Sequence, residues 1–235
     1  MESKRLLAPL ALAFILSGCA TAEIPYDHSS AGIRSVGLLT PGIPDGASIV
    51  LASDPGQSFG LVGALVDAGL QNNREGKFEH ILASQQFVAA NEFWSDLTAN
   101  LQRDGYAIVP IAGARDRSDF LKKYPTPPSP VDAYLDVIVQ SYGYMAAGIG
   151  SANPYRPFML VKCRLVRAAD SAVLMQDQIA LNALNNGGPK QVTLSPEPAY
   201  AFPGMDDLVA DPKNAAAGVK TAFQQSTTSI GNLLK

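Results

Sequence analysis

Residues 131–144, VDAYLDVIVQSYGY, alternate between apolar and polar side chains. A period of two is typical of a β-strand that buries one face. We expect one face to carry Ala133, Leu135, Val137 and Val139, and the other to carry Tyr134, Asp136, Gln140 and Tyr142, with Ile138 as an apolar exception. The stretch therefore predicts a long core strand.

Two later stretches repeat this alternation. Residues 158–167 place Met159, Val161, Cys163 and Leu165 on one side, and Lys162 and Arg164 on the other. Residues 173–183 place Val173, Met175, Ile179 and Leu181 on one face. Because the segment 168–171 (AADS) is a tight connection, the two stretches predict an antiparallel hairpin.

Strands and helices alternate in the rest of the chain. The expected elements are strands at 33–39, 48–52 and 106–110, a helical region opening near Ser58 and interrupted near Gly76, one long helix over 78–101 with room for one bend, and a closing helix over 215–234. A strand, a helix and a strand with short connections predict a crossover between parallel strands. Residues 185–214 are expected to be a long irregular segment.

These elements predict an α/β (α+β) fold with a single domain over residues 33–235. We expect a mixed sheet of four to five strands, covered mainly on one face by the long internal helix and the C-terminal helix. The chain has 235 residues and a formal net charge of −3. This mildly acidic balance argues against a nucleic-acid partner.

The N-terminus has the pattern of a secretory signal peptide. Lys4 and Arg5 precede an apolar run over residues 6–16, and small residues follow. A membrane-spanning helix needs about 20 apolar residues, so this run is too short to be one. We expect residues 1–18 to be removed.

The residues LSGC at 16–19 resemble the lipobox of bacterial lipoproteins. The resemblance implies cleavage before Cys19, a diacylglycerol thioether on its sulfur and an acylated amine, a triple anchor that would hold the protein to a membrane. Ala20, where Asp would favour the inner membrane, implies the outer membrane, facing the periplasm. Residues 19–32 are expected to form a flexible lipidated tether. An alternative cut after ATA at 20–22 would release a soluble protein.

The body is similar in architecture to periplasmic domains of the curli-secretion lipoprotein, of the Tol system's amino-terminal module and of uncharacterised envelope lipoproteins. The stretches 133–137, 165–167 and 173–175 carry this likeness, which is one of strand pattern without a diagnostic motif. Function must therefore be argued from a site.

Two carboxylates on the central strand are candidates for an acid pair. Asp132 and Asp136 flank Tyr134, and Lys162 and Arg164 are expected on the facing strand. Cross-strand ion pairing on the polar face explains all four residues without catalysis.

Other candidates also have structural explanations. The glycine-rich loop 143–150 lacks the ending of a phosphate-binding loop. The glycine-spaced stretch 59–70 predicts either a core helix or a docking face. His28 and His80 lack metal-ligand spacing. Cys163 is expected to be a small buried hydrophobe, and Trp94 a core residue.

The sequence thus favours a non-catalytic protein without cofactor or metal, attached to a membrane through Cys19. It would dock another envelope component or a second copy of itself through the stretch 59–70, the loop 143–150 or the proline-rich loops. The alternative is an accessory protein that carries a lipid or small ligand. A hydrolase would need a convergent polar cluster, which the sequence does not supply.

Overall fold

The computed structural model describes residues 23–51, 68–113, 119–126, 130–148, 150–183 and 191–235, with side chains of α2 described from Asn73 onward. The helices are α1 (His28–Ala31), α2 (Ala68–Ser84), α3 (Ala89–Arg103), α4 (Met205–Ala210) and α5 (Pro212–Asn232), with a 3-10 turn η1 (Pro198–Tyr200). The strands are β1 (Ser35–Leu39), β2 (Ser48–Leu51), β3 (Ala107–Ile111), β4 (Ala133–Ala146), β5 (Arg156–Arg167), β6 (Val173–Leu181) and β7 (Val192–Leu194).

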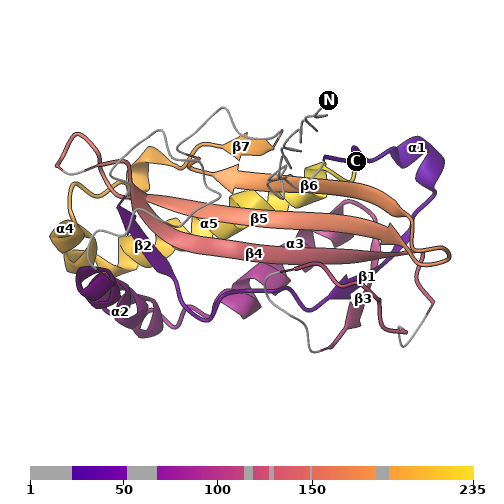
Figure 1. Cartoon of the computed structure of the whole chain (residues 1–235), viewed down its shortest axis with the longest axis horizontal. Coiled ribbons are helices and arrows are strands. Elements are labelled where there is room, and N and C mark those ends of the chain that lie inside the picture. Colours follow the sequence, from indigo (N-terminus) through magenta and orange to yellow (C-terminus); the bar gives the residue numbers. More distant parts are fainter. Residues whose placement is uncertain (1–22, 52–67, 114–118, 127–129, 149, 184–190) are drawn as a thin grey trace, which may run out of the picture.

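All seven strands form one mixed sheet (Figure 1). Its order is β3-β1-β4-β5-β6-β7, and β2 pairs with β4 beyond the end of β1. The pairs β1–β3 and β1–β4 are parallel, whereas β4–β5 and β5–β6 are antiparallel. The single-domain α/β prediction is confirmed. The sheet exceeds the expected four to five strands because β2 continues along β4 and because β7 lies in the segment expected to be irregular.

The predicted hairpin is β5–β6, and its core face carries Met159, Val161, Cys163 and Leu165 as expected. The register shifts between Leu165 and Val166, so that Val166 pairs with Val173 while Leu174 packs against the core. The prediction that Val173 shares the core face was therefore wrong, because one extra residue reverses the alternation.

A second bulge lies in β4. Val139 pairs with Val161, but Ser141 pairs with Leu160, which leaves Gln140 as the extra residue. Beyond this point the alternation is inverted, so Tyr142 and Tyr144 join the core. The prediction that Tyr142 lies on the outer face was therefore wrong.

The expected long helix is two helices. Gln86 has a φ of 55°, the N–H of Phe87 donates to the carbonyl of Leu82 at 2.9 Å, and the N–H of Gln86 donates to the carbonyl of Ala83 at 3.0 Å. These two bonds around a left-handed residue form a Schellman motif, which ends α2 before α3 begins. Gly76, the expected interruption, lies inside α2.

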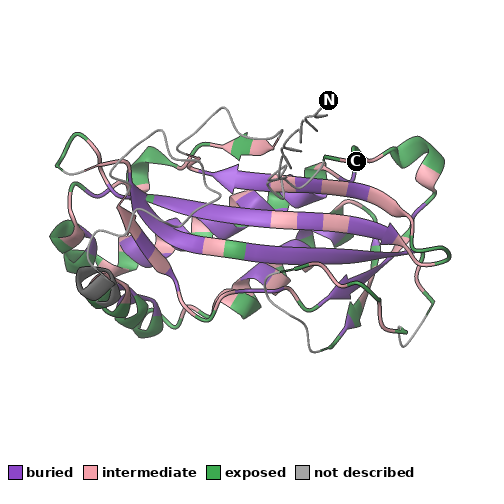
Figure 2. Ribbon diagram, in the orientation of Figure 1, coloured by how far each residue is buried: buried purple, intermediate pink, exposed green. Residues whose placement is uncertain are grey.

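The helices α3 and α5 lie behind the sheet in the view of Figure 1, and β4 and β5 are buried along most of their length (Figure 2). Phe223 of α5 is fully buried at the centre of this layer. The rings of Phe87, Phe93 and Tyr142 each meet it edge-on, at centroid distances of 5.4, 5.9 and 5.1 Å. Such pairs add about 0.5–1.5 kcal/mol each beyond the apolar area they bury.

The two outer edges of the sheet differ. The N–H of Ala107 and the carbonyl of Ile111 both bond towards the β1 side, so the intervening Pro110 directs its backbone nitrogen to the open edge of β3. On the other side, the outer edge of β6 is occupied by β7 and by Ile24, which bridges Gln176. Residues 23–32 thus lie against the domain, which contradicts the flexible tether expected there.

Candidate functional site

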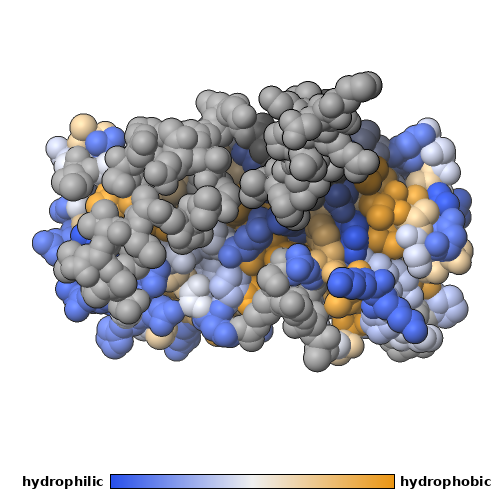
Figure 3. Space-filling model, in the orientation of Figure 1, coloured by the Kyte–Doolittle hydropathy of each residue, from blue (hydrophilic) through white to orange (hydrophobic). Residues whose placement is uncertain are grey.

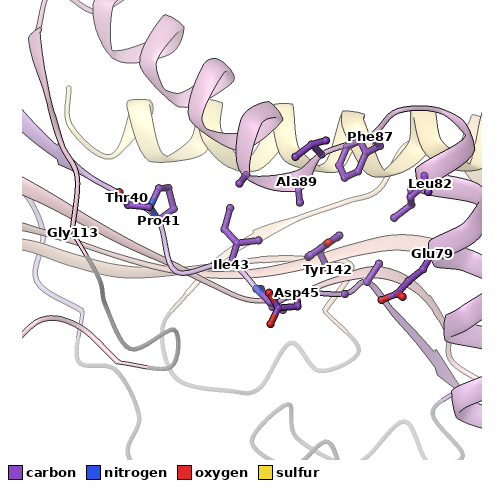
Figure 4. Close-up of a pocket in the computed structure, with 16 residues that line it drawn as sticks. Thr40, Pro41, Ile43, Asp45, Glu79, Leu82, Phe87, Ala89, Gly113 and Tyr142 are labelled. Atoms are coloured by element: carbon purple, nitrogen blue, oxygen red, sulfur yellow. The ribbon is translucent and has the colours of Figure 1, made fainter.

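A cleft of about 700 Å³ opens between the β1–β2 connection and the junction of α2 and α3 (Figure 4). The connection contributes residues 40, 41 and 43–47, α2 contributes Glu79, Leu82 and Ala83, and the α3 side contributes residues 87–90. The Schellman motif shapes this wall because it places Phe87 beside Leu82, its usual apolar contact. A fold feature that the sequence did not predict therefore builds one side of the cleft.

The floor of the cleft is aromatic and aliphatic. Tyr142 is only 4% exposed, and its ring and that of Phe87 rest on Phe223. Ile43 and Leu82 are also buried and line the same space. The residues between the sheet and the α2–α3 junction therefore provide a preformed apolar surface.

The mouth of the cleft is acidic. Figure 4 shows Asp45 and Glu79 on one side of Tyr142, with Phe87 and Ala89 on the other. A methyl group at Gly46 would overlap the Glu79 carboxylate, so this glycine lets the carboxylate lie against the backbone.

The pKa of the Tyr142 hydroxyl reflects its surroundings in the cleft. Burial, and then the nearby Glu79 and Asp45 carboxylates, raise the pKa of its hydroxyl to about 12. A phenol is already protonated at neutral pH, and these effects keep the Tyr142 hydroxyl protonated well into the alkaline range. An apolar group that carries a positive charge matches this arrangement, because its carbon atoms can pack on the floor while its cation approaches the exposed Glu79 carboxylate.

The two candidates for an acid pair, Asp132 and Asp136, are separate structural carboxylates. Asp132 accepts hydrogen bonds from the N–H groups of Arg34 and Ser35 at 2.9 and 2.8 Å, which fastens the start of β4 to β1. These bonds lower the pKa of Asp132. Lys162 lies opposite Ile138, so the cross-strand ion pairing that was expected to explain all four residues does not account for Lys162.

Asp136 and Arg164 do face each other, as predicted, but under a loop. The fully buried Asp136 accepts a hydrogen bond from the N–H of Leu121 at 2.8 Å, and Arg164 donates to the Leu121 carbonyl at 2.8 Å and to the Tyr124 hydroxyl at 2.6 Å. The guanidinium lies 4.4 Å from the centre of the Phe120 ring. This group fastens residues 120–124 to the face of the sheet opposite the helices, where hydrophilic and apolar atoms are mixed in Figure 3.

The remaining candidates do not come together at one place. Residues 143–146 belong to β4 and not to a loop. His28 donates from Nδ1 to the carbonyl of Leu234 at 3.2 Å, and His80 is exposed on α2. Cys163 is fully buried in the core, as predicted, and burial raises the pKa of its thiol. Trp94 is partly buried against the core.

Some expectations lie outside the described residues, namely those for Cys19 and for residues 59–67. Within the described part of the chain, no group of three or more His, Cys, Asp or Glu residues is arranged to hold a metal ion. The same described residues include no helix long and apolar enough to cross a bilayer.

The sequence did not identify the cleft residues Asp45, Glu79, Phe87 and Tyr142. Asp45 lies in an ordinary turn sequence, and Glu79 on an exposed helix face, so neither carries a local signal. Tyr142 does carry a local signal, because the apolar alternation of β4 changes phase at Gln140. Two runs of period two that are out of phase indicate a bulge.

Taken together, these features define a one-domain α/β protein with a half-open apolar cleft and an acidic rim.

No known protein family matches the chain, and no curated protein matches it either. Similar solved structures include a Xanthomonas campestris protein of family DUF330, with 13% identity, a TM-score of 0.46, and coverage of 90% of this chain and 89% of that one. The lipoprotein GNA1162 from Neisseria meningitidis has 15% identity and a TM-score of 0.29, over 63% of this chain and 81% of that one. The PelC dodecamer from Paraburkholderia phytofirmans has 8% identity and a TM-score of 0.32, over 90% and 96%.

Proposed function

We propose that this chain is a non-catalytic lipoprotein of the bacterial envelope that docks another envelope component in the cleft. Its anchor would be Cys19, on the outer membrane and facing the periplasm, as the lipobox resemblance implies. The observation that supports docking is the combination of an apolar floor with the exposed Glu79 carboxylate at the mouth. A partner segment that presents an apolar side chain beside a lysine or arginine fits this chemistry.

Two exposed valines allow a matched test of docking. Val88, 51% exposed, lies on the rim of the cleft, whereas Val209, 38% exposed, lies on α4 outside it. A photo-crosslinking residue replaces each valine in turn in living cells. We expect one defined envelope protein to crosslink from position 88 and not from position 209.

The acidic rim provides the specificity control. The variant Glu79→Gln should weaken the crosslink from position 88 about fivefold, since exposed charge contacts contribute about 1 kcal/mol. Asp206→Asn removes an exposed carboxylate of α4 and should leave the crosslink unchanged. Identical products from positions 88 and 209, or a crosslink insensitive to the rim variant, would contradict the proposal.

A small-ligand carrier is the second candidate, and the size of the cleft favours it. About 700 Å³ lies within the range of small-molecule sites, roughly 300–1,000 Å³. A ligand with an apolar body and an amine would satisfy the same residues. Native mass spectrometry of the purified protein should then detect a bound amphiphile, and Ala89→Trp, which fills the cleft, should remove it.

The lipid anchor has its own test. Radiolabelled palmitate should enter the wild-type protein and not a Cys19→Ser variant. A protein that is secreted, correctly folded and unlabelled would instead have been cut after Ala22.

A further inference from the structure

The first described residues of the chain are fastened to the outer edge of the sheet. Ile24 and Gln176 exchange two backbone hydrogen bonds, of 2.8 and 2.9 Å, in an antiparallel bridge to β6. Both backbone groups of Gln176 point away from β5, because they are used by Ile24. The chain therefore enters the domain at a fixed point, on the edge of β6.

The next residues are held as well. Asp27 caps α1 by accepting hydrogen bonds from the N–H groups of Ser29 and Ser30 at 3.1 and 3.3 Å, and His28 bonds to the carbonyl of Leu234 next to α5. Tyr26 and Ala31 pack against the core. With the bridge at Ile24, these contacts fix the start of the domain beside β6 and the last turn of α5.

Little chain remains between this point and the expected lipid. Ile24 lies five residues after Cys19. At about 3.3–3.6 Å per extended residue, five residues reach at most about 18 Å. A lipidated Cys19 would thus hold the edge of β6 close to the bilayer, a step that rests on the lipid anchor proposed above.

The cleft lies towards the opposite edge of the sheet from Ile24. Gly42, within the connection that lines the cleft, bridges Ile138 of β4 on the edge away from β5. From Ile24 the path crosses β6, β5 and β4, a distance of about 19 Å at roughly 4.8 Å per strand spacing. Figure 1 shows α1 and the C-terminus along one long side of the molecule, and β1, β3 and α2 along the opposite side.

We infer that the outer edge of β6, with β7 and the last turn of α5, is the surface that faces the lipid headgroups, and that the cleft opens away from that membrane. Of the two large apolar side chains that are exposed in the described chain, Val88 and Val209, neither lies on this edge. The short connection to the lipid orients the domain, and no apolar insertion is needed. The cleft then takes its occupant from the aqueous side and not from the bilayer that anchors the protein.

Energy transfer to a membrane-bound acceptor tests this orientation. Thr193→Cys places a donor dye on exposed β7, and Val88→Cys places one at the cleft. Cys163 is buried and stays unlabelled. The full lipidated protein is reconstituted in phosphatidylethanolamine–phosphatidylglycerol vesicles with an acceptor on the headgroups. We expect at least twofold more transfer from position 193 than from position 88.

A longer connection should abolish the difference. Twenty Gly/Ser residues inserted between Ala22 and Glu23 add a reach of about 25 Å, so transfer from the two positions should become equal. Equal or greater transfer from position 88 in the protein of native length, or a difference that survives the insertion, would overturn the orientation alone. Protein that carries no lipid by mass spectrometry and gives no transfer from either position would overturn the lipid anchor, and this inference with it.

Discussion

The Oδ2 atom of Asp136 and the Nη2 atom of Arg164 lie 3.9 Å apart across the β4–β5 pair, with Asp136 fully buried and the Arg164 side chain 18% exposed. Neither charge can be removed alone without leaving its partner in a site of low polarity. The pair therefore stabilises the attachment of residues 120–124 to the sheet.

The variant Asp136→Ala should lower the free energy of unfolding by about 3 kcal/mol, because it leaves the Arg164 guanidinium without its counter-charge in a mostly buried site. Urea denaturation followed by circular dichroism measures the change. Lys220→Gln is the control, since Lys220 and Glu92 form an exposed ion pair at 2.9 Å that is worth about 1 kcal/mol at most. Equal losses in the two variants would contradict a structural role for the buried pair.

Gln86→Gly should raise the free energy of unfolding by about 1 kcal/mol. Gln86 adopts a φ of 55°, a left-handed conformation that glycine adopts without steric cost. Ala83→Gly, on the last turn of α2, is the matched control and should lower stability by about 1 kcal/mol. Thermal unfolding of both variants checks the prediction, and a loss of stability in Gln86→Gly would show that the glutamine side chain itself matters.

Gly143→Ala should destabilise the protein strongly, by about 3 kcal/mol or more. Gly143 has a φ of 141°, and an added methyl group would collide with the backbone of Ser48 where β2 pairs with β4. Gly76→Ala, inside α2 with open space around it, should instead stabilise by up to about 1 kcal/mol. Urea midpoints that move in the same direction for both variants would refute this reading.

Stability should fall as the pH rises above 10. Burial, with the Glu79 and Asp45 carboxylates, raises the pKa of Tyr142 to about 12, and burial, with the Asp136 carboxylate, raises the pKa of Tyr124 to about 12. Between pH 10 and 12 the unfolded chain therefore releases protons that the folded protein retains, so the contribution is complete below pH 10 and is lost above it. Urea unfolding at pH 9 and pH 11 measures the fall, which should be smaller in Tyr142→Phe. An identical fall in that variant would exclude Tyr142 as a cause.

The β5–β6 hairpin was predictable because its alternation is uninterrupted from Met159 to Leu165. The same rule failed at Gln140, where one extra residue moved Tyr142 from the outer face into the core. The helix end at Gln86 was also missed. A left-handed residue at the end of a helix is usually glycine, and here it is glutamine. Local patterns thus identified the strands and misjudged the points where the backbone departs from regular geometry.

The cleft could not be predicted from local sequence patterns, for a different reason. Asp45 and Glu79 line the same cleft only because the β1–β2 connection runs along β4 and because α2 packs nearby. Neither residue differs from an ordinary solvated carboxylate in its own sequence neighbourhood. Tertiary packing creates the shared site, so it becomes visible only in the folded structure.

Pro110 on the open edge of β3 affects how copies of this domain can associate at high concentration. Where the peptide N–H of another residue would point outward, proline offers none, so an incoming strand finds a missing donor in the middle of a five-residue edge. Strand pairing through β3 between copies of this domain that are packed densely side by side is therefore disfavoured. The protein can therefore reach a high local density without forming continuous fibres through this edge.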